Sequence, residues 1–500
     1  MAADHRPART PSLAGAAPGG SAAPRGDAAP GGGAAPWPTL AVVAAGLFLA
    51  VLSTTAVSVA LPTIGHDLRA STTDLEWTVD AYVLVYASLL LPGGVAGDRR
   101  GRKGVFILGV AVFGCGSLGA GLAPATGLLL AGRVVQGVGP ALLIPGSLAI
   151  IRATFSDERQ RSMAIGLWST SAGVAMAVGP ALGGVIVGAL GWRWVFLLNA
   201  PLSAALVTLA ARVVPRLPRA ATHGPFDWPG AAASVAGVAL LALAVIEGQD
   251  QGWTSALVVA AFAAGAGVLT AFVLAERRRA APLVDVSLFL RPAFAAANLA
   301  ALIVFFAFVG AIVYFSAYFQ QVQGRSPVAA GLAVGVIGVA YAMAAAWSGR
   351  LVGRFGERWP LLIGLITSGL ATLALLRLEP ATGIGAIWWN FALLGGGIGL
   401  CGTPMTTLAL SAVDVSRAGM ASAVLNAARQ IGQVFGVAVL GGLVYAHLPG
   451  RAGRPLDGGQ RQLFVAGLHA ALVVSGVALI AAALVISPWL IRSRAGTFRP

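Results

Sequence analysis

The sequence predicts an all-α membrane protein with about fourteen membrane-spanning helices. Of its 500 residues, 57% are hydrophobic and only 10% are charged, whereas soluble domains have about 25% charged residues. Residues 94–103 carry one acid and four basic residues between two long apolar runs. Charge this dense cannot lie in hydrocarbon, so the segment must connect two spanning helices in water. A weaker copy at residues 349–358 indicates that the chain has two related halves.

The spans follow one another as apolar runs of roughly 20 residues, the length that a helix needs to cross a bilayer. We expect them at residues 39–64, 75–95, 104–123, 126–150, 162–188, 197–214, 229–248, 254–275, 294–318, 328–347, 360–377, 384–409, 419–446 and 464–490. The stretch 384–446 is the hardest to divide. Residues 1–37 are rich in Ala, Pro and Gly, which predicts a disordered tail.

Basic residues recur in every second connector, which indicates that these connectors and both termini are cytoplasmic. Arg451, Arg454 and Arg461 are the exception, since they fall in the last outer connector. The net charge of +15 is spread over short connectors, so it favours membrane topology over nucleic-acid binding.

The sequence lacks the motifs that are typical of several classes of protein. The single lysine, Lys103, has no phosphate-binding context, so the chain is not expected to hydrolyse ATP. The 5 histidines are scattered, and no metal site or cofactor is expected. Any pumping must therefore draw on an ion gradient.

An ionisable side chain at mid-bilayer costs roughly 2.5–3.5 kcal/mol, so each one inside a predicted span is a functional candidate by default. Asp80 lies one turn inside the second span, and Arg133 opens the fourth, with Gln136 on the same face. Asp80 is the candidate proton carrier. The alternative is that Asp80 pairs with a base or lines a water-filled vestibule. Arg133 stays charged, so it can only modulate a neighbouring acid.

The fifth span combines glycines at helical spacing with a proline, an arrangement that permits close packing and a kink. These residues are Gly173, Gly179, Pro180, Gly183 and Gly184. They suit a hinge or seal, although ordinary tight packing has the same spacing.

Taken together, these motifs resemble those of the major facilitator superfamily. Residues 94–103 are similar to its loop motif between helices two and three, with Gly94, Asp98, Arg99, Gly101, Arg102 and Lys103. Arg133, Gln136, Gly137 and Gly139 match its fourth-helix motif, and the glycines and proline of the fifth span look like its antiporter motif. Residues 191–201, 282–289 and 426–432 resemble runs typical of the fourteen-helix drug:proton antiporter branch.

The resemblance implies a major facilitator fold. The two six-helix bundles would be residues 38–215 and 281–490, with a two-helix insertion at 216–280 and cytoplasmic tails at 1–37 and 491–500. The implied activity is proton-coupled efflux of amphipathic, often cationic, drugs or antibiotics by a monomer in the bacterial cytoplasmic membrane. Proton binding and release at Asp80, influenced by Arg133, would bias the two states, and residues 94–103 would latch the cytoplasmic side. Candidate cavity residues are Tyr82, Tyr86, Gln136, Trp168, Tyr314 and Tyr318.

One departure concerns the first span. Members of that branch usually carry an Asp and an Asn where this chain has Ser53 and Ser58. The missing acid shifts proton coupling toward Asp80. A site with few acids also favours neutral or weakly charged substrates over dications.

Three alternatives stay open. A proton-coupled uptake carrier or a facilitator for a small metabolite would share the fold. A non-transporting sensor or scaffold would be expected to carry an additional soluble domain. A membrane enzyme is disfavoured because no catalytic constellation is visible in the sequence.

Overall fold

The computed structural model describes residues 36–217, 226–279, 282–446, 448 and 456–495, and across these ranges the chain is helical without a β-strand. In this part of the chain, 14 helices are long and apolar enough to cross a membrane, which confirms the predicted architecture. The predicted tails fall largely outside the described residues: the first helix begins at Pro36 and the last ends at Ala495.

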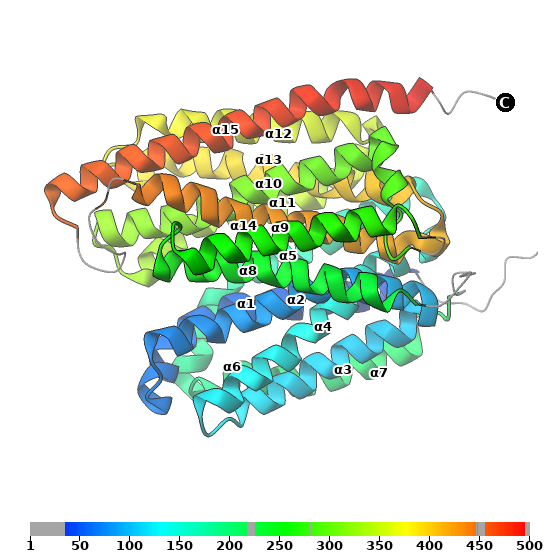
Figure 1. Cartoon of the computed structure of the whole chain (residues 1–500), viewed down its shortest axis with the longest axis horizontal. Coiled ribbons are helices and arrows are strands. Elements are labelled where there is room, and N and C mark those ends of the chain that lie inside the picture. Colours follow the sequence, from blue (N-terminus) through cyan, green and yellow to red (C-terminus); the bar gives the residue numbers. More distant parts are fainter. Residues whose placement is uncertain (1–35, 218–225, 280–281, 447, 449–455, 496–500) are drawn as a thin grey trace, which may run out of the picture. The chain divides into compact units, whose positions relative to one another are not determined.

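The first six spans pack together as one bundle, coloured blue to cyan and blue-green in Figure 1. They are α1 (Pro36–Leu68), α2 (Thr72–Arg100), α3 (Arg102–Gly121), α4 (Thr126–Thr154), α5 (Glu158–Leu190) and the pair α6 (Arg193–Leu197) and α7 (Asn199–Val213). Helix α4 packs against α2 and α3, while α5 packs along α1. The sixth span is thus two helices, and it starts four residues before the expected residue 197.

Two further helices follow the first bundle, α8 (Trp228–Gln251) and α9 (Ala256–Glu276). They pack against each other, and α8 also contacts α2 and α14. Figure 1 shows this green pair lying along the two bundles. Helix α8 therefore covers the seam between α2 of the first bundle and α14 of the second.

The second bundle begins after the short 3₁₀ helix η1 (Val286–Leu290). Its helices are α10 (Pro292–Ala317) with the π-helical turn η2 (Tyr318–Val322), α11 (Pro327–Phe355), α12 (Arg358–Leu373) with η3 (Ala374–Arg377), α13 (Ile384–Ser411), η4 (Val415–Arg417) with α14 (Ala418–Tyr445), and α15 (Gly458–Ala495). The long stretch 384–446 is divided at residues 412–417. The two bundles meet chiefly through α2 against α14 and α5 against α11.

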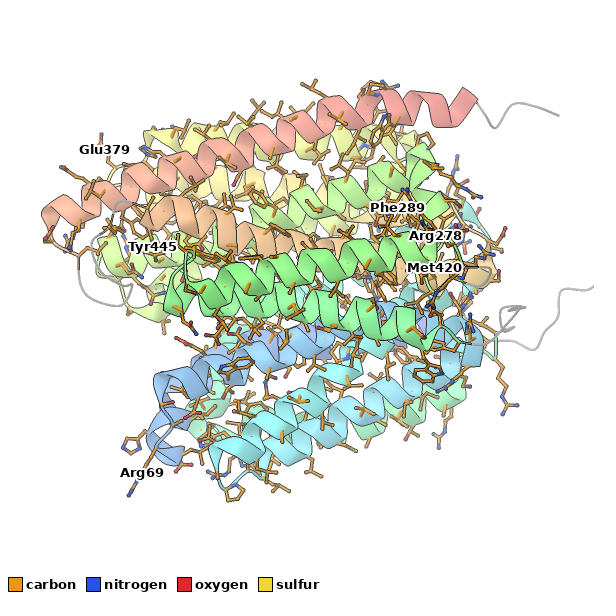
Figure 2. The ribbon with its side chains drawn as sticks, in the orientation of Figure 1. Arg69, Arg278, Phe289, Glu379, Met420 and Tyr445 are labelled. Atoms are coloured by element: carbon orange, nitrogen blue, oxygen red, sulfur yellow. The ribbon has the colours of Figure 1, made fainter. Side chains whose placement is uncertain are left out.

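The connectors gather at two opposite ends of the helices. Figure 2 shows Arg278, Phe289 and Met420 at one end, and Arg69, Glu379 and Tyr445 at the other. We call the first the basic end, because the basic connector at residues 94–103 lies there and contacts the connector at residues 412–417. The second is called the far end.

The connector at residues 94–103 is tighter than a loop of ten residues. Helix α2 continues through Arg100 and α3 starts at Arg102, so only Gly101 lies between them. Its φ of +107° is a conformation that side chains with a Cβ rarely adopt. The charged residues of this segment therefore stand on helical turns, which fixes the direction in which each one points.

Candidate functional site

A cavity of about 240 Å³ lies between the two bundles. Helices α1, α2, α4 and α5 line it from the first bundle, and α10, α11 and α14 line it from the second. Its aromatic residues are Tyr82, Tyr86, Trp168, Phe305, Phe308 and Tyr341, and its polar residues are Thr54, Thr55, Ser169, Asn426, Arg429, Gln430 and Gln433. Of the described lining residues, only Arg429 carries a charge.

Arg429 reaches this cavity from α14. It lies eleven residues after the helix start at Ala418, or about 17 Å along the axis, which is near the middle of a hydrocarbon layer about 30 Å thick. Its Nη1 donates to Asn426 Oδ1 at 3.2 Å, and its Nη2 donates to Thr406 Oγ1 at 2.9 Å. The guanidinium carbon lies 5.4 Å from the ring centroid of Phe305. Arg429 is 9% exposed.

A second buried arginine, Arg133, lies in the first bundle on α4 and is fully enclosed. Its Nε donates to the Thr78 carbonyl at 2.6 Å and its Nη1 to Gln136 Oε1 at 2.6 Å. The guanidinium stacks on Tyr82, 4.4 Å from the ring centroid. Because Tyr82 lines the cavity and Arg133 does not, the Tyr82 ring separates Arg133 from the cavity.

Gln136 extends the Arg133 cluster to two other helices. Its Nε2 donates to Ser53 Oγ on α1 at 3.0 Å and to Ser117 Oγ on α3 at 2.6 Å. The bond from Arg133 to the Thr78 carbonyl connects the cluster to α2 as well. The cluster therefore joins α1, α2, α3 and α4. Ser53 belongs to it, at the position where related sequences are expected to carry an acid.

Asp80 lies on α2, two residues after Thr78, and is half-buried. Its charge acts on the Arg133 guanidinium. Asp80 is not one of the cavity-lining residues. Asp80 and Arg133, the two predicted coupling residues, thus lie within electrostatic range of each other, and neither lines the cavity.

Asp98 joins the two bundles at the basic end. Its Oδ1 accepts from Arg102 Nε and from the backbone N–H of Gly419, both at 3.0 Å, and its Oδ2 accepts from the Met420 N–H at 2.8 Å. Since α14 begins at Ala418, the carboxylate sits at the helix N-terminus, where free N–H groups and the helix dipole favour an anion. We call these four residues the Asp98 clamp.

Close backbone packing accompanies the clamp. A Cβ at Gly94 would lie 2.5 Å from both the Gly419 carbonyl oxygen and Ala423 Cβ. A Cβ at Gly419 would lie 2.6 Å from the Gly94 carbonyl oxygen. Helices α2 and α14 can therefore approach this closely only because both positions lack a side chain.

The related segment 349–358 makes an equivalent contact on the other seam. Gly349 stands in register with Gly94, and a Cβ there would lie 2.5 Å from the Ser162 carbonyl oxygen on α5. The position of Asp98 is taken by Gly353, where a Cβ would meet Arg159 at 3.4 Å. Both seams thus share the glycine contact, and the Asp98 carboxylate is specific to the seam between α2 and α14.

The other residues predicted for the latch contact different parts of the chain. The Arg99 guanidinium carbon lies 5.5 Å from the Phe226 ring centroid, just before α8. Lys103 Nζ donates to the Ala211 carbonyl on α7 at 2.7 Å. Arg102 also donates to the Val415 carbonyl, so it reaches the second bundle as Asp98 does.

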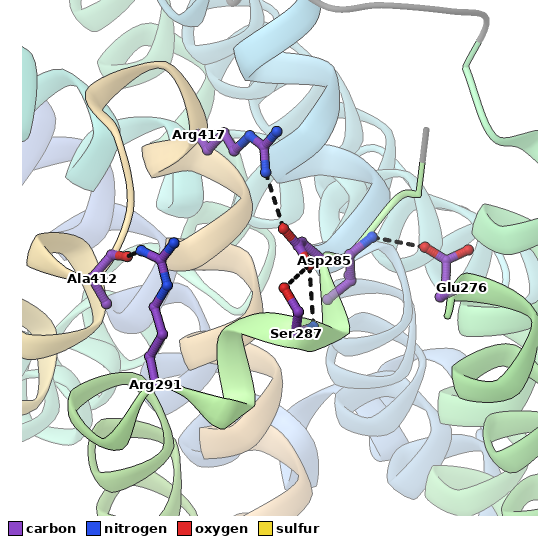
Figure 3. Close-up of polar contacts among 7 residues, drawn as sticks. Glu276, Asp285, Ser287, Arg291, Ala412 and Arg417 are labelled. Carbon is purple, nitrogen blue, oxygen red and sulfur yellow. Dashed lines mark hydrogen bonds and ion pairs between the residues drawn. The ribbon is translucent and has the colours of Figure 1, made fainter. Parts of the chain in front are cut away.

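The connector at residues 412–417 is held from several directions, as the close-up in Figure 3 shows in part. Arg417 Nη1 pairs with Asp285 Oδ2 at 3.1 Å, and Arg291 donates to the Ala412 carbonyl. From the first bundle, Arg152 donates to the Val413 carbonyl at 3.5 Å. The segment 282–291 is tied in turn to α9, where Glu276 accepts from the Val284 N–H at 2.9 Å.

The glycines of α5 serve two different contacts. A Cβ at Gly173 would lie 2.7 Å from Tyr341 on α11, across the seam between the bundles. Cβ atoms at Gly179 and Gly183 would collide with Thr55 and Ala56 on α1, within the first bundle. Gly184 has more room, with Val59 at 3.9 Å, and Pro180 is exposed.

The predicted cavity residues divide into two groups. Tyr82, Tyr86 and Trp168 line the cavity. The other three do not, and here the prediction was wrong for this cavity: Gln136 is enclosed with Arg133, Tyr314 donates to the Val437 carbonyl at 2.5 Å, and Tyr318 donates to the Glu379 carbonyl at 2.6 Å.

Arg429 is not among the site residues predicted from the sequence, although it lies in the run 426–432 that resembles the drug:proton antiporter branch. The signal was present in the sequence, because an arginine within the apolar run 419–446 is a functional candidate on the same grounds as Asp80. Phe308 and Tyr341 carried no such signal, because aromatic residues are common on every face of a spanning helix.

Comparison with known proteins gives one family. The sequence pattern of the Major Facilitator Superfamily matches residues 43–437. The multidrug resistance protein Stp of Mycobacterium tuberculosis is 35% identical over 82% of this chain and 76% of its own length. The methylenomycin A resistance protein of Streptomyces coelicolor is 34% identical over 81% of this chain and 84% of its own length.

Solved structures agree on the fold. The human organic anion transporter MFSD10 superposes with a TM-score of 0.66 over 90% of this chain and 99% of its own, at 16% sequence identity. At that identity the similarity concerns the arrangement of helices alone.

Proposed function

The chain belongs to the Major Facilitator Superfamily, and from this premise we propose that it exports amphipathic drugs or antibiotics in exchange for protons. The observation that carries the proposal is the apolar cavity between the two bundles, which the Asp98 clamp joins to each other at the basic end. Relatives named for multidrug and antibiotic resistance support it. Both walls of the cavity come from one chain, which fits a transporter that works as a monomer.

The basic end is assigned to the cytoplasm. Arginine and lysine are retained on the cytoplasmic side of membrane proteins, and the described connectors at this end carry Arg99, Arg100, Arg102 and Lys103. With this orientation both termini are cytoplasmic. The clamp and the contact of Gly94 with Gly419 close the cytoplasmic side, so the conformation is one from which substrate would leave outward.

Proton coupling is assigned to Asp80, with Arg133 as its modulator. A proton that binds Asp80 removes the negative charge that acts on Arg133. Arg133 contacts α2 directly and reaches α1 and α3 through Gln136. A change of charge at Asp80 therefore alters the balance of contacts among the helices that form one wall of the cavity, without a direct contact with substrate.

The transport cycle then requires the cytoplasmic side to open. The Asp98 carboxylate must leave the N-terminus of α14, and Arg102 must leave the Val415 carbonyl. Helices α2 and α14 separate, and substrate enters the cavity from the cytoplasm or inner leaflet. Closure at the glycine contacts restores the conformation described above.

The test is transport by everted membrane vesicles that contain the full chain. An imposed proton gradient should drive accumulation of at least one probe from a panel of anionic, neutral and cationic amphipathic dyes. Asp80→Asn should abolish gradient-driven accumulation. Glu76→Gln is the matched control, because Glu76 lies on the same helix one turn earlier and is exposed.

Two results would count against the proposal. If the wild-type chain accumulates none of the dyes in energised vesicles, export of amphipathic molecules is wrong. If Asp80→Asn accumulates dye as well as Glu76→Gln does, the proton is carried elsewhere.

A further inference from the structure

We propose that the cavity binds amphipathic acids, and that Arg429 pairs with their anionic group. The inference rests on the proposed export function and deepens it by naming the substrate class. It departs from the cationic drugs that the family resemblance implies.

The first support is the charge balance of the cavity. Arg429 is a cation near the middle of the membrane, yet no ion pair is formed by it within the residues described. Its hydrogen-bond partners, Asn426 and Thr406, are neutral. Since no acid lines the cavity as described, the charge that would compensate Arg429 must be supplied by what the cavity binds. A buried charge is costly unless it is paired.

The second support is the unused hydrogen-bonding capacity of two residues that line the cavity. Arg429 Nε and Trp168 Nε1 are buried donors that find no acceptor among the described residues. They belong to opposite walls, on α14 and α5. Tyr86 and Tyr341 also line the cavity and lie within electrostatic range of Arg429. A carboxylate offers only acceptors, so it complements this set of donors.

Arg133 shows why the inference concerns Arg429 alone. The Arg133 guanidinium is covered by Tyr82 and bonded to Thr78 and Gln136, and the Asp80 charge lies nearby. An anion in the cavity could not contact it without displacing the Tyr82 ring. Arg429 has the open side that Arg133 lacks.

The remaining wall is apolar and sets the rest of the ligand. Phe305, Phe308 and Tyr341 form a continuous aromatic surface next to Arg429, with Phe308 stacked on Tyr341 at 5.6 Å. The volume of about 240 Å³ is close to the lower limit of ordinary small-molecule sites, about 300 Å³. The site therefore fits a compact aromatic or aliphatic body with one acidic group.

The test compares three probes that share one body and differ in charge: 1-naphthaleneacetate, 1-naphthaleneacetamide and 2-(1-naphthyl)ethylamine. Binding is measured by equilibrium dialysis of the purified full chain in detergent, against micelles without protein. We expect the acid to bind roughly 10- to 100-fold more tightly than the amide, because a hydrogen bond to a charged group is stronger than a neutral one. The amine should bind most weakly.

Four variants, the last of them a control, test whether Arg429 causes the preference for the acid. Arg429→Gln should remove the advantage of the acid over the amide, and Arg429→Lys should keep part of it. Trp168→Phe should weaken acid binding less than Arg429→Gln does. Arg325→Gln, an exposed arginine outside the cavity, should bind all three probes as the wild type does. Size-exclusion profiles show which variants are folded.

The measurements distinguish a failure of the binding inference from a failure of the proposed export function. Equal binding of the three probes, tightest binding of the amine, or an acid preference that survives in folded Arg429→Gln would overturn the inference. Accumulation of the acid, but not of the amine, in energised everted vesicles beyond the level in matched vesicles without the protein would support it. If the acid binds through Arg429 while no probe is accumulated, the inference stands and the proposed export function is what fails.

Discussion

Arg133 and Arg429 are the same residue in two different settings. Arg133 is sealed in the first bundle, bonded to Thr78 and Gln136 and covered by Tyr82. Arg429 is held by Asn426 and Thr406 in the second bundle, but one side faces the cavity. A buried charge alone therefore does not define a binding site. What matters is whether the protein itself completes the coordination of that charge.

The largest effect is expected from Arg133→Leu. The Thr78 carbonyl and Gln136 Oε1 would each lose a charged donor, which costs about 3 kcal/mol of unfolding free energy in total. Transport should be lost with it. Thermal unfolding of the purified protein, followed by size-exclusion chromatography, measures the change.

Arg429→Gln is the matched comparison. It should lower the free energy of unfolding by less than about 1 kcal/mol, because the amide can still bond Asn426 or Thr406. Equal destabilisation by the two substitutions would remove the distinction between an enclosed and an open arginine.

Gly94→Ala should have the next largest effect, since it acts on the seam and leaves both arginines in place. The added methyl group would lie 2.5 Å from the Gly419 carbonyl oxygen and from Ala423 Cβ. Overpacking of this kind costs on the order of 1–3 kcal/mol, so the population of the cytoplasmic-closed conformation should fall by roughly 5- to 160-fold relative to the open one.

Transport by Gly94→Ala should fall to a similar degree, whereas dialysis should still detect 1-naphthaleneacetate. Gly97→Ala is the control, because a Cβ at Gly97 has open space. If both alanine variants transport normally, the glycine contact does not govern closure.

Ser53→Asp should change coupling rather than affinity. The new carboxylate would take the place of a buried hydroxyl that accepts from Gln136 Nε2 at 3.0 Å, beside the Arg133 cluster. We expect Asp80→Asn combined with Ser53→Asp to regain part of the gradient-driven transport that Asp80→Asn lacks. Proton flux and substrate flux in the same vesicles measure this. A double variant as inactive as Asp80→Asn would show that an acid at position 53 cannot substitute.

Tyr82→Phe should have the smallest effect. It removes the hydrogen bond from the Tyr82 hydroxyl to the Ala50 carbonyl at 3.0 Å, worth about 1 kcal/mol, and keeps the ring over Arg133. Tyr82→Ala should instead open Arg133 to the cavity and give 1-naphthaleneacetate a second site. Identical stoichiometry of acid binding in Tyr82→Ala and Tyr82→Phe would show that the ring is not the barrier.

The sequence predicted the helices well because each bilayer span leaves an apolar run of characteristic length. It also placed Asp98 and its neighbours at a connector, since dense charge cannot lie in hydrocarbon. The partners of Asp98, the N–H groups of Gly419 and Met420, could not be predicted. Backbone groups leave no mark in a sequence, and the contact joins residues more than 300 positions apart.

Side-chain directions were the least predictable feature. Tyr82 lines the cavity and Tyr314 does not, yet both stand in apolar helices. Lipid and helix interfaces are similarly apolar, so hydrophobic periodicity does not distinguish the two faces of a spanning helix. Arg429 was accessible to the argument used for Asp80, and only its position beside the cavity required the structure.

Substrate binding and proton coupling can be measured separately in one system. In proteoliposomes, exchange of labelled for unlabelled 1-naphthaleneacetate needs binding and alternating access but no gradient, whereas uphill transport also needs the proton. We expect Asp80→Asn to exchange substrate without driving it uphill. Arg429→Gln should exchange little substrate at a concentration that half-saturates the wild type, because its affinity for the acid falls to that for the amide. The opposite pattern, with exchange lost in Asp80→Asn and kept in Arg429→Gln, would contradict both expectations.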